Sequence, residues 1–208
     1  MIPADAMMVF FAASLLLAVA PGPDNIFVLT QSAMCGRVAG LAITLGLCTG
    51  LIVHTMLVTF GVAVIFQTSA VAFTALKLVG AAYLAYLGWQ AFRASGQDLQ
   101  AQNANPLSLL QFYRRGIFMN VTNPKVSVFF LAFLPQFTDA ARGPIAPQML
   151  MLGGLFIVAT ILVFGTISLL AGTLGQWLAR SSRAQKILNR ITGTVLVLLA
   201  LRLALAER

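Results

Sequence analysis

The sequence predicts an all-α polytopic membrane protein of six transmembrane helices, built as two inverted three-helix repeats with the first helix of each half broken. Its 208 residues are 60% hydrophobic and only 9% charged, whereas a soluble domain carries about 25% charged residues. Apolar stretches long enough to cross a bilayer recur six times, and helix breakers interrupt the first and fourth of them. One membrane domain, 1–208, therefore accounts for the chain.

The chain divides into two halves of three apolar stretches each. In order, the stretches cover residues 4–35, 38–66, 71–92, 115–137, 148–174 and 187–205. The polar stretch 93–113 separates half one (1–92) from half two (114–208). Because each half holds an odd number of crossings, the second half is expected to be inverted in the membrane.

The first and fourth stretches carry the breakers. Residues 21–25 read Pro21-Gly22-Pro23-Asp24-Asn25, and the fourth stretch contains Asn120 followed by Asn123-Pro124-Lys125. Paired interrupted helices in corresponding positions indicate the binding site of a transporter. The run before Pro21 ends like a signal-peptidase site, but no Lys or Arg precedes it and proline would follow the cut, so we expect it to be retained.

The second and third stretches add features of other kinds. Gly40, Gly46 and Gly50 would let another helix approach the second stretch closely, which permits a homodimer. Lys77, near the start of the third stretch, can extend its ammonium group to the outer interface. His54 is more simply interpreted as a hydrogen-bonded helix residue than as a proton relay.

The distribution of Lys and Arg predicts the orientation. Arg142 is the one basic residue in the loops after the second and fourth stretches. The other loops hold Arg37, Arg93, Arg114, Arg115, Arg180, Arg183, Lys186 and Arg190. The positive-inside rule then makes the loops 93–113 and 175–190 cytoplasmic and puts both termini outside, in a cell inner or plasma membrane. If the first stretch is only re-entrant, the N-terminus moves inside.

Composition also argues against several partners. The net charge of +8 comes from short clusters between apolar runs, so it does not indicate nucleic-acid binding. Cys35 and Cys48 have no second Cys/His cluster near them, and no phosphate-binding or zinc-protease motif occurs. We expect no cofactor, no metal site and no enzymatic activity.

Two charges are predicted to lie near the bilayer midplane. Lys125 follows Arg115 by ten residues, which is about 15 Å of helix and half of a hydrocarbon core of about 30 Å. Asp24 precedes Arg37 by thirteen residues, or about 20 Å. Charges at that depth usually face a cavity or each other.

These residues match the chemistry of an amino-acid zwitterion. Its ammonium group would contact Asp24, and its carboxylate would contact Lys125 and a helix N-terminus. Neutral hydrogen-bonding groups nearby come from Asn25, Asn120, Thr122 and Asn123. The alternative is a purely structural salt bridge between Asp24 and Lys125 that locks the two broken helices.

The motifs together resemble the LysE/RhtB family of amino-acid exporters over nearly the whole chain. They are Pro21-Gly22-Pro23-Asp24-Asn25, Gly36-Arg37-x-x-Gly40, Lys77-x-x-Gly80-Ala81-Ala82-Tyr83-Leu84-x-x-Leu87-Gly88, Phe118-x-Asn120-x-Thr122-Asn123-Pro124-Lys125 and Phe133-Leu134-Pro135-Gln136-Phe137. The resemblance implies proton-coupled, secondary-active export of small amino acids of the homoserine, threonine or lysine type. The paired breaks suggest alternating access as the mechanism, with the two halves exchanging around Asp24 and Lys125. It carries the family's marked positions onto Pro21, Pro23, Asp24, Asn25, Lys77, Asn123, Pro124 and Lys125.

The resemblance makes Asp24 and Lys77 candidates for coupling or gating. Not all members of the family carry an acid at position 24, which favours Asp24 as a contact for the substrate ammonium group. Two alternatives stay open: efflux of metal cations, for which one midplane carboxylate is poor ligand chemistry, and a non-transporting membrane subunit.

Overall fold

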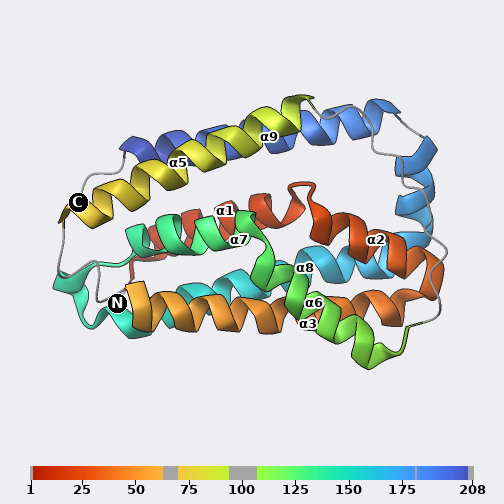
Figure 1. The fold of residues 1–208 in the computed structure, drawn as a ribbon, viewed down its shortest axis with the longest axis horizontal. Helices are drawn as coiled ribbons and strands as arrows, with labels where there is room; N and C mark the ends of the chain where they lie inside the picture. The colour runs from red at the N-terminus through yellow and green to blue at the C-terminus, as the bar shows by residue number, and fades with distance from the viewer. Residues whose placement is uncertain (1, 63–69, 94–106, 181, 206–208) are drawn as a thin grey trace.

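The computed structural model describes residues 2–62, 70–93, 107–180 and 182–205, and this part of the chain contains helices and no strands (Figure 1). The predicted all-α class is therefore confirmed. The α-helices are α1 (Ala4–Val19), α2 (Pro23–Cys35), α3 (Arg37–Leu57), α5 (Ala70–Arg93), α6 (Leu109–Thr122), α7 (Pro124–Val128), α8 (Ile145–Arg180) and α9 (Ser182–Leu205). Short π-helical and 3₁₀ turns extend α3 over Val58–Val62 and α7 over Phe129–Phe137, and a 3₁₀ turn covers Ala140–Arg142.

Three described segments are long and apolar enough to cross a membrane: Arg37–Gly61, Ile145–Ala171 and Gln185–Leu205. The number rises to five if each of two bent pairs, α1 with α2 and α6 with α7, makes one span. Six crossings arranged as inverted repeats remain a prediction.

Both breaks fall at the predicted prolines. The axes of α1 and α2 meet at 60°, and those of Leu109–Thr122 and Pro124–Phe137 at 51°. Pro23 and Pro124 each take the first turn of the helix that follows, where the missing N–H costs no internal bond. Both helix breaks thus have a direct cause in the sequence.

Glycines set the packing of α3 against α6. A Cβ on Gly46 would collide with the backbone carbonyl of Tyr113, and a Cβ on Gly50 would lie 2.6 Å from Asn120 Oδ1. On the facing helix, a Cβ on Gly116 would collide with the carbonyl of Ile43. These small residues permit close helix approach within one chain, so they no longer support the predicted homodimer.

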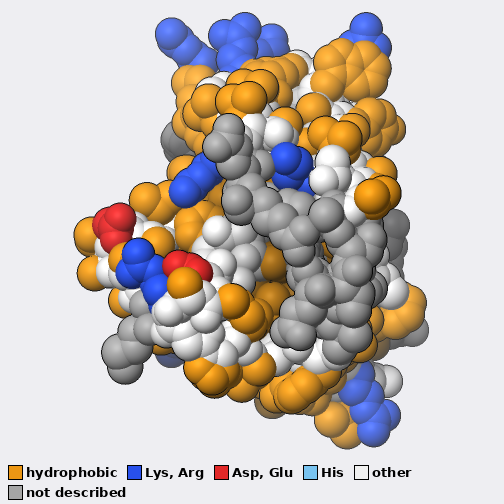
Figure 2. Space-filling view, turned by 90° about the vertical axis from the view of Figure 1, so that its left-hand side faces the viewer, with side chains coloured by type: hydrophobic (Ala, Val, Ile, Leu, Met, Phe, Trp, Pro, Cys, Tyr) orange, Lys and Arg blue, Asp and Glu red, His pale blue; other side chains and the backbone are white. Residues whose placement is uncertain are grey.

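The remaining helices pair in a regular way. In Figure 1, α5 lies along α9, and α1 and α2 run above α8, which itself packs on α3. Phenylalanines fill the core beside α7, with Phe10, Phe129 and Phe156 buried and in ring contact. Many large hydrophobic side chains of the helices are exposed, among them Leu45, Phe118 and Leu198, as expected of a surface that faces lipid. Figure 2 views the left-hand end of the bundle in Figure 1, where Lys, Arg, Asp and Glu side chains lie among hydrophobic ones.

The two ends of the bundle differ. Both termini lie at the left of Figure 1, and the junction of α2 with α3 lies at the right. The predicted loop 175–190 is wrong as a loop, because helix continues to Arg180 and resumes at Ser182. The charged residues there mark the end of an apolar stretch, but charge alone does not end a helix. Residues 94–106 of the predicted loop 93–113 lie outside the described residues, and α6 already begins at Leu109.

Candidate functional site

The two helix breaks touch each other through Lys125. Its ammonium group donates to the carbonyl of Ala20 at 2.9 Å and to that of Leu17 at 3.3 Å, and the side chain is buried. Because the chain leaves the helix at Pro21, the last carbonyls of α1 lack partners within it. Lys125 from the second break therefore caps the helix that ends at the first break, and one of its three N–H groups is left for a ligand.

A second connection runs from Asn123 to Asp24. Asn123 Nδ2 donates to Asp24 Oδ2 at 2.8 Å, and Asn123 Oδ1 accepts the backbone N–H of Lys125 at 3.0 Å. The ion pair among the described residues is that of Asp139 with Arg142, so Asp24 and Lys125 do not form the structural salt bridge considered above. The two buried charges are held by separate partners.

Three buried oxygens near the breaks have no hydrogen-bond partner. They are Asp24 Oδ1, Asn25 Oδ1 and Asn120 Oδ1. The amide nitrogen of Asn25 is occupied, since it donates to the carbonyl of Ala18 at 2.7 Å across the first break. Unsatisfied buried acceptors are costly, and a cationic donor such as an ammonium group would satisfy them.

The carbonyl of Asn120 shows how the second break is stabilised. Pro124 has no N–H to donate to the residue four positions earlier. That carbonyl instead accepts the backbone N–H of Asn123 at 3.0 Å and lies 3.2 Å from Nε2 of His54, on α3. His54 is thus hydrogen-bonded and buried, as its simpler interpretation requires.

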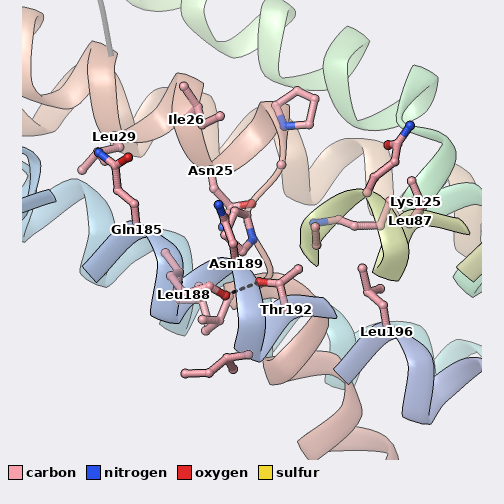
Figure 3. A pocket seen from close by; sticks show the side chains of 18 of the residues that line it. Asn25, Ile26, Leu29, Leu87, Lys125, Gln185, Leu188, Asn189, Thr192 and Leu196 are labelled. Atoms are coloured by element: carbon pink, nitrogen blue, oxygen red, sulfur yellow. Dashed lines mark hydrogen bonds between the residues drawn. The ribbon is translucent and has the colours of Figure 1, made fainter. Parts of the chain in front are cut away.

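A cavity of about 1040 Å³ opens beside the breaks. Figure 3 shows Asn25 and Lys125 on one side of it and Gln185, Asn189 and Thr192 of α9 on the other. Two basic side chains, Lys125 and Arg183, line the cavity, and its described lining includes no carboxylate. Much of the remaining lining is apolar, as is typical of a small-molecule site.

The predicted site residues fall into three groups. Those that line the cavity are Pro21, Gly22, Pro23, Asn25, Asn123, Pro124 and Lys125. Asp24 and Asn120 are buried next to these residues but are not part of the lining. Lys77 is half-buried on α5 and is also outside the lining.

Sequence reasoning missed the wall formed by α9. Gln185, Asn189 and Thr192 line the cavity, and their spacing of four and three residues puts them on one helix face. The spacing is present in the sequence, but the basic residues beside it also fit a cytoplasmic membrane boundary, so the spacing alone does not indicate a site. Thr166 of α8 and Gln90 of α5 also line the cavity and carry no comparable signal.

No group of three or more His, Cys, Asp or Glu side chains that could hold a metal ion occurs among the residues that the structure describes.

A helical membrane bundle with two broken helices that meet at a largely apolar cavity with a few polar groups defines a multi-pass membrane transporter. Over residues 7–207 the chain matches the LysE type translocator family. This chain belongs to that family, so it is an efflux transporter of the membrane and not an enzyme.

Its curated relatives are similar over almost their full length. A homoserine/homoserine lactone efflux protein of Salmonella typhi is 36% identical over 198 residues, covering 95% of each chain. The corresponding protein of Salmonella typhimurium has the same identity and coverage. An uncharacterized membrane protein of Vibrio cholerae is 30% identical over 200 residues, covering 96% of this chain and 97% of its own. No solved structure is a significant match.

Proposed function

We propose that this chain exports a small amino acid or derivative, of the homoserine, threonine or lysine type, from the cytoplasm. The observation that carries the proposal is the meeting of the two breaks, where a buried ammonium group and unpartnered carboxylate and amide oxygens lie beside a cavity. The names of the Salmonella relatives support the same substrate class.

The zwitterion would use both signs of charge. Its carboxylate binds the third N–H of Lys125, and the exposed N-terminus of α2 favours an anion at the same place. Its ammonium group binds Asp24 Oδ1 and Asn25 Oδ1, which have no hydrogen-bond partner within the described chain. Asp24 must become accessible for this contact, and a shift of Asn123 away from it would provide the access.

Alternating access between two inverted halves is the proposed mechanism. The helix pairing supports it, because α3 packs on α6 of the other half while α8 packs on α1 and α2. If the two halves are related by symmetry, α3 corresponds to α8, and α1 with α2 corresponds to α6. The contact of α3 with α6 is then equivalent to the contact of α8 with α1 and α2. Lys125 and Asn123, which join the breaks across the halves, would release and re-form their bonds during the cycle.

Proton coupling is proposed on Asp24, the buried carboxylate of the described chain. Lys77 does not line the cavity, and it remains a candidate for gating because of the family resemblance. The proposed setting is a cell inner membrane with residues 93–113 and 175–190 on the cytoplasmic side. A homodimer is an open possibility that the glycines of α3 do not support.

The test is efflux from cells preloaded with a labelled amino-acid mixture. Wild type should lose one or a few amino acids faster than cells without the protein, and Asp24→Asn and Lys125→Ala should lose that advantage. Lys186→Ala is the matched control, since Lys186 is exposed on α9 and outside the cavity lining. All variants must be compared at equal membrane levels.

Wild-type export by both Asp24→Asn and Lys125→Ala would sink the proposed mechanism. Export of divalent cations instead of amino acids in a competition panel would favour the metal alternative. If no solute is exported and none stabilises the protein against heat, a non-transporting subunit becomes the better reading.

A further inference from the structure

The cavity wall formed by α9 has no role in holding the charged ends of an amino acid. Those groups are assigned to Asn25 and Lys125, which line the cavity at the breaks (Figure 3), and to Asp24, which is buried beside them. A substrate anchored there has its side chain free to extend toward α9. Resting on the proposed function, we infer that Asn189 and Thr192 form the specificity subsite, which reads a hydroxyl group on the substrate side chain.

The hydrogen bonding of Thr192 carries the inference. Its hydroxyl donates to the carbonyl of Leu188 at 2.9 Å, one turn earlier, and the side chain is only 3% exposed (Figure 3). The single hydroxyl proton is therefore occupied, and Oγ1 can act toward a ligand only as an acceptor. A side-chain hydroxyl is a donor of the right size, whereas a methyl group in the same place would leave Oγ1 without a ligand partner.

Asn189 completes the subsite. It precedes Thr192 by three residues, so the two side chains lie on one face of α9, and both line the cavity. Its amide carries N–H donors and an acceptor oxygen, the two kinds of group with which a hydroxyl can pair, and Asn189 also interacts within the protein. Leu188 and Leu196 of the same helix line the cavity beside them and supply apolar contact for the methylene groups.

The charge of this wall disfavours one competing class. Arg183 also lines the cavity from the start of α9, and no carboxylate is found in the described lining. The ammonium group of a lysine side chain would meet a like charge there and no counter-ion. The wall therefore fits a short, neutral, hydroxylated side chain better than a long basic one.

The experiment uses purified protein in proteoliposomes and two pairs of competitors of equal shape. Threonine is compared with valine, and homoserine with norvaline, because each pair exchanges a hydroxyl for a methyl group. In the wild type the hydroxylated member should compete about tenfold better, as the loss of one buried hydrogen bond predicts. Thr192→Val should bring the ratio close to one, mainly through KM for the hydroxylated substrate.

Thr192→Ser is the matched control, since it keeps the hydroxyl and should keep most of the preference. Asn189→Ala provides a second variant on the same wall and should also reduce the ratio. Equal competition by both members of each pair in actively transporting wild type would overturn the inference and leave amino-acid export intact. Absence of transport of every amino acid in the wild type would overturn the proposed function, and the inference with it.

Discussion

At the scale of single residues, Lys125 is the side chain on which both breaks depend. Its ammonium group satisfies the carbonyl of Leu17 in α1 and that of Ala20 just after α1, so its removal leaves two buried acceptors without a partner. The ammonium group of Lys125 also lies so close to Gly22 that it limits which side chain can stand at that position. A Cβ on Gly22 would lie 3.2 Å from Lys125 Nζ, closer than ordinary van der Waals contact.

Gly22→Ala should therefore lower export while the protein still folds. The added methyl group displaces the ammonium group by a few tenths of an ångström and weakens its bond to Ala20, at a cost of about 1 kcal/mol. Efflux rate and thermal midpoint, measured on the same preparations, check this. Gly154→Ala is the control, because nothing lies within 4 Å of a Cβ there and alanine favours a helix. Equal export by the two variants would contradict the close approach.

At the scale of elements, the contact of α3 with α6 determines whether the second break is held in place. Asn120 lies on α6 just before the break, and its carbonyl lies 3.2 Å from Nε2 of His54 on α3. The two helices can approach so closely only because Gly46 and Gly116 have no side chains.

Gly46→Ala should destabilise the protein by about 1–3 kcal/mol, the usual cost of overpacking a tight contact. The methyl group would meet the backbone of Tyr113, which cannot move aside without separating the helices. Thermal unfolding in detergent measures the effect, and Gly154→Ala again serves as a substitution without a neighbour. An unchanged midpoint together with loss of a dimer would mean that Gly46 packs between chains instead.

The elements also show what the sequence could predict. Pro21, Pro23 and Pro124 act locally, so both breaks could be located from the sequence alone. The partners of Asp24 and Lys125 could not, because they depend on how two distant segments approach each other. The two charges were expected to contact a substrate, with a salt bridge between them as the alternative, and the structure gives each of them neutral partners within the protein. The wall of α9 was missed because its polar residues contact the site only across the folded bundle.

At the scale of the whole molecule, the described chain has two distinct ends, and basic residues concentrate at one of them. Both termini lie at the left of Figure 1, while the junction between α2 and α3, where Arg37 begins α3, lies at the right. From the positive-inside rule we expect the right-hand end to be cytoplasmic. In that orientation the part of the cavity near Arg183 faces the cytoplasm, from which an exporter must take its substrate.

Cys35 gives a direct test of this orientation, because it is exposed at the end of α2, next to Gly36, whereas Cys48 is buried. In a Cys48→Ser background, a membrane-impermeant maleimide should label Cys35 in inside-out vesicles and leave it unlabelled in right-side-out vesicles. Arg142→Cys, added to a Cys35→Ser, Cys48→Ser background, should give the reverse pattern, because Arg142 lies in the turn before α8 and is exposed. If Cys35 were labelled only in right-side-out vesicles, the orientation of the protein in the membrane would be the reverse of the one proposed. The end of the cavity that carries Arg183 would then face the outside, and an exported substrate could not enter there.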